Sequence, residues 1–201
     1  KVLKKLSNLD IHETYPDNYC TELRKKLAKK YKISENHFIF GNGSVEIIQM
    51  ISRILLDNTS EVITCTPSFS SYWSEAILQD SQIVEVPLNE YKFDLNAIAS
   101  KINDKTKLIY ITNPNNPTGT IVSHNELETF LNKVSKNILV VLDEAYYEFV
   151  INKEYPNSIN LLKKFNNICI LRTFSKAYGL AGLRIGYGIS SPETILELEK
   201  A

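Results

Sequence analysis

The sequence has little of what metal sites and disulfide-rich secreted proteins require. Among its 201 residues there are three cysteines and three histidines. They are widely separated and lack the short intervals of metal ligands: Cys20, Cys65, Cys169, His12, His37 and His124. We therefore expect no metal, and reduced thiols as in a cytosolic protein.

The chain also lacks an excess of either charge and any long apolar run. Its 23 basic and 23 acidic residues give a formal net charge of zero, so there is no basic footprint for nucleic acid or for an anionic membrane. No run approaches the roughly 18–20 apolar residues of a membrane-spanning helix, and no signal-peptide pattern is visible. We expect a cytoplasmic protein without nucleic-acid or membrane partners.

What the chain does have is an alternation of apolar strands and helical segments. With 43% apolar residues, a chain of this length can bury a sizeable core in one domain. The alternation predicts an α/β fold, a mostly parallel seven-stranded sheet with helices on both faces. The expected strands are 38–40, 61–65, 82–87, 107–112, 138–143, 168–172 and 184–189, and the expected helices are 18–31, 45–56, 69–79, 94–101, 123–135 and 192–200.

The most informative segment is TFSKAYGLAGLR, residues 173–184. A lysine that forms a Schiff base needs a neutral amine, and a nearby cation such as Arg184 lowers the cost of that form for Lys176. The hydroxyls of Thr173 and Ser175, together with the guanidinium, suit a dianionic phosphate monoester. Pyridoxal 5′-phosphate, a carbonyl cofactor that carries a phosphate, matches both features. A polar loop with a solvated Lys176 is the alternative at this point.

Two other polar segments follow apolar runs that read as strands. The sequence NPNNPTG, residues 113–119, follows one run, and Asp143 ends another. Ligands of open α/β sheets bind outside the carboxyl ends of parallel strands. We therefore expect Asn116, Asp143 and Lys176 to converge on one crevice. Taken singly, a Pro/Asn/Gly turn would explain the first segment and a helix cap would explain Asp143.

Together, these motifs resemble those of the fold-type-I aminotransferases, in the class-II branch that contains histidinol-phosphate aminotransferase. TFSKAYGLAG is similar to the pyridoxal-lysine signature of the class-II enzymes, and NNPTG and DEAYYEF are similar to motifs of that branch. The resemblance extends over essentially the whole chain. It implies the large domain of these enzymes, pyridoxal 5′-phosphate as cofactor and a homodimer, with one antiparallel strand at 184–189. It is less specific for the substrate.

Carried over residue by residue, the resemblance implies a role for each motif. Lys176 would hold the cofactor as a Schiff base and, once released, would act as the general acid/base of a proton shift. Asp143 would pair with the pyridinium nitrogen and keep the ring an electron sink. Asn116 and Tyr146 would hydrogen-bond the phenolic oxygen of the ring. The phosphate would be bound by Thr173, Ser175 and Arg184.

A second support for the phosphate is expected where a strand meets a helix, in the turn GNGS at residues 41–44. N–H groups at a helix start bind anions without a special side chain, and Ser44 could cap this helix. Such a turn is by itself an ordinary strand-to-helix connection. The resemblance makes Gly43, Ser44 and Val45 a phosphate cup. Many relatives have aspartate at the position of Val45. If only the backbone amide matters, this difference is tolerated; if the side chain orders the loop, we expect weaker cofactor affinity.

Two aromatic residues complete the expected site. Phe69 follows the strand 61–65 and aligns with the aromatic residue that stacks on the cofactor ring, although a core position would be the ordinary interpretation. Tyr15, in the sequence TYPD, matches a tyrosine that in relatives reaches from the partner subunit to the phosphate. An ordinary turn would also explain Tyr15.

The resemblance also implies parts that this sequence does not contain. Relatives begin with a segment that closes over the site and continue into a smaller C-terminal domain, which supplies the arginine for the substrate α-carboxylate. The arginines here are Arg24, Arg53, Arg172 and Arg184, and the last is assigned to phosphate. We therefore expect residues 1–201 to be a large-domain fragment that binds pyridoxal phosphate but turns over amino acids poorly.

The function that the resemblance favours is amino-group transfer, with histidinol phosphate and 2-oxoglutarate/glutamate as the substrate pair. Threonine-phosphate decarboxylase and aromatic amino-acid aminotransferase use the same cofactor frame and stay open. A non-catalytic, cofactor-sensing module of a transcription regulator is a further alternative, which needs a DNA-binding helix-turn-helix upstream. The residues that select the substrate are expected to lie largely outside this sequence.

Overall fold

The computed structural model describes residue 2 and residues 15–201, and the chain divides into two compact units, residues 1–35 and 36–201. In the first unit, α2 (Thr21–Tyr31) follows a turn closed by Asp17. The carboxylate of Asp17 accepts the backbone N–H groups of Tyr19 at 3.0 Å and Thr21 at 2.7 Å. The helix expected over 18–31 therefore begins three residues late, because its first residues form this turn.

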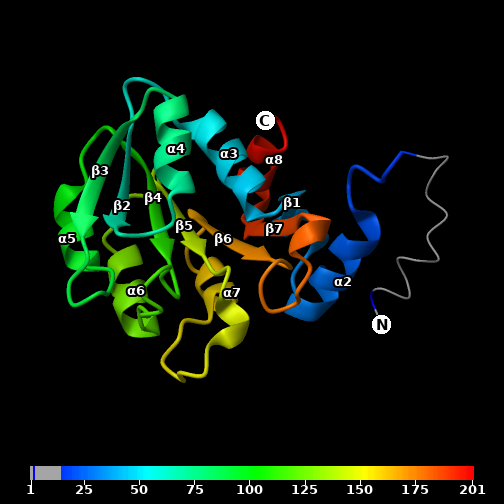
Figure 1. The fold of residues 1–201 in the computed structure, drawn as a ribbon. Helices are drawn as coiled ribbons and strands as arrows, with labels where there is room; N and C mark the ends of the chain where they lie inside the picture. The colour runs from blue at the N-terminus through cyan, green and yellow to red at the C-terminus, as the bar shows by residue number, and fades with distance from the viewer. Residues whose placement is uncertain (1, 3–14) are drawn as a thin grey trace. The chain divides into compact units, whose positions relative to one another are not determined.

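The second unit is built on one seven-stranded sheet, in the order β1-β7-β6-β5-β4-β2-β3 (Figure 1). β7 is antiparallel to both of its neighbours, β1 and β6, and the remaining pairs are parallel. The mostly parallel sheet with one antiparallel strand is thus confirmed. The strands are β1 (Phe38–Asn42), β2 (Glu61–Thr66), β3 (Gln82–Pro87), β4 (Thr106–Thr112), β5 (Leu139–Asp143), β6 (Ile168–Thr173) and β7 (Ile185–Ser190).

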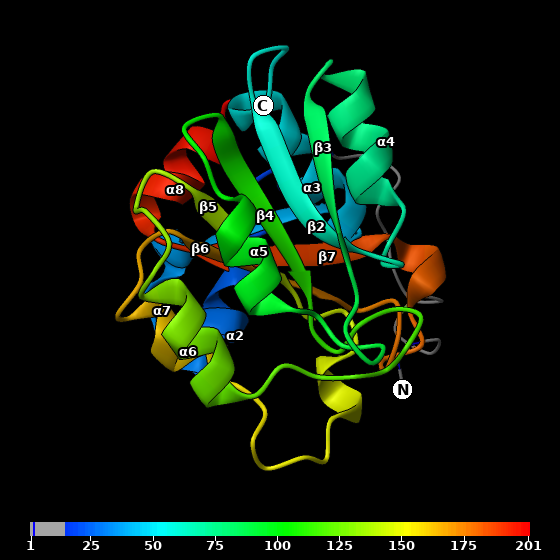
Figure 2. The ribbon, with the colours of Figure 1, turned by 90° about the vertical axis from the view of Figure 1, so that its left-hand side faces the viewer.

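Helices cover both faces of this sheet, as expected (Figures 1 and 2). On one face, α3 (Ser44–Leu55) contacts both α4 (Ser71–Leu78) and α8 (Pro192–Leu198). On the other face lie α5 (Leu95–Lys101), α6 (His124–Leu131) and α7 (Ser158–Leu162). Within residue 2 and residues 15–201, no helix has the length and apolar character needed to cross a membrane.

The central strands are apolar because both of their faces are covered. Every residue of β5 and β6 is buried, and so is every residue of β4 except Lys107. Parallel strands enclosed by helices read as continuous apolar runs for this reason. The polar residues that end these strands, Thr112, Asp143 and Thr173, are therefore brought to the same edge of the sheet.

Four short helical segments of the described residues were not expected from the sequence. They are α7, with five residues, and the 3₁₀ turns η1 (Glu35–His37), η2 (Tyr147–Phe149) and η3 (Ala181–Leu183). Segments this short do not complete the apolar repeat that reveals a helix. η2 and η3 nevertheless flank the site, because η2 directly follows Tyr146 and η3 begins with Ala181, and both of these residues line it.

Candidate functional site

A cavity of about 230 Å³ lies at the carboxyl ends of the central strands. Each predicted cofactor-binding residue except Tyr15 lines it. The lining residues are Gly43, Ser44, Val45, Phe69, Thr112, Asn116, Asp143, Ala145, Tyr146, Thr173, Ser175, Lys176, Ala181 and Arg184. A larger hollow of about 590 Å³ adjoins the cavity, since it shares Asn116 and Tyr146 and is bordered by Phe149 and Ile151.

Tyr15 belongs to the N-terminal unit, and its side chain is 99% exposed. It is not among the residues that line the cavity. The role foreseen for it, in the site of a partner subunit, stays a prediction. Among the residues that the structure describes, no three His, Cys, Asp or Glu side chains are grouped as metal ligands, and His12 lies outside those residues.

Asp143 is a carboxyl group held in a buried position at the end of β5. Its side chain is 3% exposed. The hydroxyl of Tyr72 donates to Asp143 Oδ2 at 2.8 Å, and the backbone N–H of Ala145 donates to Oδ1 at 3.1 Å. Burial raises the pKa of Asp143, while the hydrogen bond from Tyr72 and the charge of Lys176 oppose that rise. A buried carboxyl of this kind is suited to pair with a cation that enters the cavity.

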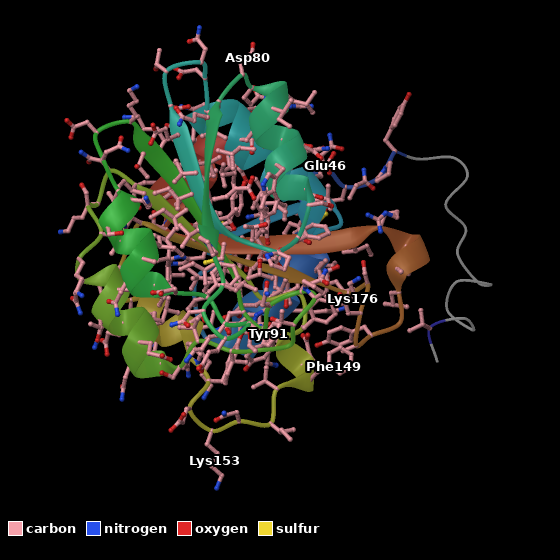
Figure 3. All side chains as sticks on the ribbon, turned by 60° about the vertical axis from the view of Figure 1, so that its left-hand side comes forward. Glu46, Asp80, Tyr91, Phe149, Lys153 and Lys176 are labelled. Carbon is pink, nitrogen blue, oxygen red and sulfur yellow. The ribbon has the colours of Figure 1, made fainter. Side chains whose placement is uncertain are left out.

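Lys176 lies at the open side of the cavity, on the connection from β6 to β7. This connection turns at Gly179, which has a φ of 65° and whose N–H donates to the carbonyl of Lys176 at 2.9 Å. The Lys176 Nζ atom lies 5.3 Å from the centre of the Tyr146 ring. The side chain is exposed (Figure 3), so its amine is accessible to a ligand.

Arg184 connects the strand β7 to the turn between β1 and α3. Its Nη2 donates to the carbonyl of Asn42 at 3.1 Å, and its Nη1 donates to the carbonyl of Ala181 at 3.0 Å. The Arg184 carbonyl in turn accepts the N–H of Gly43 at 3.0 Å. The guanidinium is therefore held beside the start of α3, and other guanidinium N–H groups are available to an anion.

The hydroxyls of Thr173 and Ser175 lie side by side in the cavity that this guanidinium also lines. Thr173 Oγ1 donates to Ser175 Oγ at 2.9 Å and accepts the backbone N–H of Ser175 at 3.1 Å. Both residues line the cavity together with Arg184. The group of two hydroxyls and one guanidinium that the sequence predicted is thus assembled.

The turn before α3 corrects one expectation, because Ser44 does not cap this helix. Ser44 is its first residue, and the N-cap is Gly43, which has a φ of 76° and no side chain. The turn requires this positive φ, which glycine adopts without strain, and the helix therefore begins directly after it. Without a side-chain cap, the first N–H groups of α3 are available to an anion.

A close approach of two backbones fixes the position of this turn. A Cβ atom added at Gly186 of β7 would lie 2.3 Å from both Gly43 C and Ser44 N. The carboxylate of Glu46 holds the other side of the turn, since its Oε2 accepts the N–H of Asn42 at 2.6 Å. The start of α3 is thus held directly against the strand that follows Arg184.

Phe69 lies both at the cavity and at the core, the two positions that its sequence context allowed. It lines the cavity and also packs against the hydrophobic core. Its ring lies edge-on to that of Tyr72, with 5.7 Å between the ring centres and 82° between the planes. A ring supported in this way can present a face to a ligand without moving.

A buried ion pair beneath the site was not predicted. Arg172 donates to Glu144 Oε2 from Nε at 2.9 Å and from Nη2 at 2.7 Å, and both side chains are 2% exposed. The guanidinium also lies 3.5 Å from the centre of the Tyr147 ring, and Ser158 donates to Glu144. This ion pair fixes the segment that carries Asp143 and Tyr146 to strand β6.

Comparisons with known proteins agree with this geometry. The family model described as aminotransferase class I and II matches residues 2–201. The histidinol-phosphate aminotransferase of Bacillus velezensis is 50% identical over 188 residues, which are 93% of this chain and 52% of that protein. This chain therefore spans about half the length of the curated relatives it matches.

Two solved structures show the same fold at lower identity. Histidinol-phosphate aminotransferase from Sinorhizobium meliloti, in complex with pyridoxal-5′-phosphate, has a TM-score of 0.87 and 28% identity, covering 93% of this chain and 51% of its own. L-threonine-O-3-phosphate decarboxylase from Porphyromonas gingivalis has a TM-score of 0.83 and 25% identity, covering 99% of this chain and 61% of its own. Since the family model matches almost every residue, this chain belongs to the aminotransferase class I and II family.

Proposed function

We propose that this chain binds pyridoxal 5′-phosphate in the 230 Å³ cavity and serves amino-group transfer between histidinol phosphate and 2-oxoglutarate. The supporting observation is that separate chain segments bring the cofactor residues of the resemblance into one cavity. The names of relatives such as the Bacillus velezensis enzyme support the substrate. Residues 1–201 would then be the cofactor-binding large domain of the enzyme.

The cavity fits this cofactor at both of its charged ends. The start of α3 offers N–H groups without a side-chain cap beside the Arg184 guanidinium, which suits a phosphate. Thr173 and Ser175 add hydroxyls there. Asp143 offers a buried carboxyl, which suits a protonated ring nitrogen.

The bound cofactor would supply an electron sink that weakens the bonds at the amino carbon of the substrate. Asp143 would hold a proton on the ring nitrogen through its carboxylate. The Nζ atom of Lys176 would hold or deliver the proton that moves at the amino carbon, and the exposure of this amine gives it access to the substrate. Asn116 and Tyr146 would orient the ring from the other side of the cavity.

Reduction with borohydride tests the cofactor assignment. The chain is incubated with pyridoxal phosphate and reduced, and peptides are analysed by mass spectrometry. We expect the cofactor on Lys176, and we expect its loss in Lys176→Arg, which keeps the charge but cannot condense with a carbonyl. Lys153→Arg is the matched control, since Lys153 lies at the end of a loop well apart from Lys176 (Figure 3). Equal labelling of the two variants would refute the assignment.

Substrate conversion tests the reaction. We expect bound cofactor to be converted to its amine form by glutamate and histidinol phosphate, slowly in this 201-residue chain. Arg184 is the arginine that lines the cavity, and it is already assigned to the phosphate, which leaves the substrate carboxylate without a guanidinium there. Rapid conversion by excess glutamate would contradict this expectation.

Decarboxylation of threonine phosphate is the second candidate, favoured by the similarity to the Porphyromonas gingivalis decarboxylase. Release of carbon dioxide from O-phosphothreonine, without conversion by glutamate, would support it over transamination. We also propose a cytoplasmic homodimer in which Tyr15 reaches the phosphate of the partner subunit. Sedimentation analysis of the chain and of Tyr15→Phe, each with and without the cofactor, tests the dimer and the role of Tyr15.

A further inference from the structure

A row of hydroxyl groups connects Asp143 to the loop that follows β4. Tyr72 Oη lies 2.8 Å from Asp143 Oδ2 and 2.9 Å from Thr112 Oγ1. Thr112 Oγ1 lies 2.9 Å from Ser68 Oγ, which lies 3.0 Å from Asn115 Oδ1. Asp143, Tyr72, Thr112 and Asn115 are each at most 3% exposed, and Ser68 is half-buried. The row therefore joins two strand ends largely out of contact with solvent.

The amide of Asn115 has a fixed orientation at the far end of this row. Its Nδ2 donates to Thr118 Oγ1 at 2.9 Å and to the carbonyl of Pro67 at 3.3 Å. Because a carbonyl can only accept, the NH₂ group must face Pro67, and the Oδ1 atom must face Ser68. The row therefore ends at an atom that only accepts.

The number of protons in the row depends on the ionisation of Asp143. Three hydroxyls, each with one proton, share four oxygen–oxygen contacts between Asp143 and Asn115. If Asp143 is ionised, three protons serve four contacts, and one pair of oxygens faces each other without a proton. With Asp143 ionised, Tyr72 donates to its carboxylate. If Asp143 is neutral, its own proton is the fourth, the bond between Asp143 and Tyr72 reverses, and every group donates toward Asn115. The complete row therefore favours the neutral carboxyl.

We propose that Tyr72, Thr112 and Ser68 form a hydroxyl relay that keeps Asp143 protonated until a cation lies against it. A positive partner reverses the preference, because a charge-assisted contact is worth more than one neutral hydrogen bond. The carboxyl proton then passes to solvent through the cavity, and Tyr72 turns to donate to the carboxylate. Thr112 and Ser68 are positioning residues in this account, since neither hydroxyl is bonded to Asp143.

The relay also links the two sides of the cavity, a consequence that rests on the proposed function. Asn115 precedes Asn116, which would bind the phenolic oxygen of the cofactor, and Asp143 would bind the ring nitrogen. When Tyr72, Thr112 and Ser68 all turn toward the ionised Asp143, the contact left without a proton is the one between Ser68 and Asn115. The ionisation of Asp143 therefore acts on the residue that precedes Asn116.

Few other groups act on the charge of Asp143. Those that face it are the backbone N–H of Ala145, Tyr72 from α4, Tyr110 from β4, the adjacent Glu144, and Lys176 beyond β6. The Ala145 N–H favours the ionised carboxylate and is unchanged in the variants below. Glu144 is paired with Arg172, which offsets its field. The Lys176 ammonium favours the ionised carboxylate, so it acts against the relay and is unchanged in the variants below.

The test is the ionisation of Asp143 in the chain without cofactor, followed by NMR of ¹³C-labelled aspartate carboxyls and assigned with Asp143→Asn. In Ser68→Ala, the ionised form retains two contacts for two protons, whereas the neutral form has three protons for two contacts. The loss of one hydrogen bond from the neutral form should increase the acid dissociation constant of Asp143 about tenfold. Thr112→Val should act in the same direction, for the same reason, and provides a second variant if Ser68→Ala does not fold.

Ser52→Ala is the matched control. Ser52 Oγ contacts the hydroxyl of Tyr110 at 3.4 Å, and the Tyr110 ring stacks on that of Tyr72 with 4.1 Å between the ring centres. Ser52 and Tyr110 do not belong to the relay. We expect the dissociation constant to be unchanged in this control. An unchanged or smaller constant in Ser68→Ala would overturn the relay. Because the titration uses no cofactor, failure of cofactor binding in the borohydride experiment would leave the relay standing, and the reverse also holds.

Discussion

Gly186 packs so closely against the turn before α3 that no side chain fits between them. In Gly186→Ala, the new methyl group would lie 2.3 Å from two backbone atoms, Gly43 C and Ser44 N. Ordinary contact begins at 3.4 Å, so the turn and β7 must separate by about 1.1 Å (3.4 minus 2.3). Backbone atoms cannot move aside as the end of a side chain can. The separation acts directly on the Gly43 N–H to Arg184 carbonyl bond, which is 3.0 Å long.

The expected cost is the upper end of the range for overpacking plus one backbone hydrogen bond, about 3–4 kcal/mol. For a domain of this size, such a loss lowers the melting temperature by about 6–16 °C. Because the turn carries the proposed phosphate cup, affinity for pyridoxal phosphate should fall as well, by more than tenfold if one charge-assisted hydrogen bond is lost.

Two other glycines provide a graded control in the same assays, thermal unfolding and equilibrium binding of pyridoxal phosphate. A Cβ at Gly188 would meet the Cγ2 atom of Ile39 at 2.9 Å, and a Cβ at Gly182 meets no atom of the described residues within 4 Å. Gly188→Ala should therefore be intermediate, and Gly182→Ala close to wild type. A Gly186→Ala protein that melts and binds as Gly182→Ala does would refute the reasoning.

Three further predictions concern charged groups of the site. Asp143→Asn removes a carboxyl whose pKa is raised by burial. Because the folded wild type resists ionisation, its unfolding free energy in urea should fall relative to that of the variant as the pH rises above about 4, and a change in the opposite direction would contradict this. Arg172→Met leaves Glu144 buried without its partner and should cost about 3–5 kcal/mol of unfolding free energy. The double variant Arg172→Met/Glu144→Leu should restore much of this loss, and no recovery would argue that the cost is not due to an uncompensated charge. Arg184→Gln should weaken pyridoxal phosphate binding roughly ten- to hundredfold, whereas the exposed control Arg53→Gln should not, and equal affinities would exclude Arg184 as a phosphate ligand.

The strands and most of the residues that line the cavity could be predicted because both are local features, although Thr112, Ala145 and Ala181 were not predicted. Each central strand is a continuous apolar run, and each site residue lies at the end of such a run or in a short motif that follows it. Asp143 and Lys176 were placed in this way, and the cavity contains both. A residue at a strand end can be assigned to the site without knowing which strands are neighbours, since all parallel strands of one sheet end at the same edge.

The supports of the site could not be predicted, because they depend on approaches between distant residues. Tyr72 and Asp143 are 71 positions apart in sequence, and an aromatic residue in an apolar helix suggests a core position more than a partner for a carboxyl. Arg172 lies within a buried strand, and nothing in the sequence pattern identifies Glu144 as its partner. The error at Ser44 has the same origin, since the φ of Gly43 follows from the contact with β7.

Because the start of α3 has no side-chain cap, the unfolding free energy of the chain depends on the ligand that binds there. Free N–H groups at a helix end and a buried carboxyl whose pKa is raised both lower the unfolding free energy of the chain without its ligand. Any anion that occupies this end raises the unfolding free energy, by about 2.7 kcal/mol when its concentration is a hundred times its dissociation constant. Supply of the ligand therefore sets how much of the chain escapes proteolysis, and a destabilising substitution elsewhere in the molecule can be rescued by ligand alone.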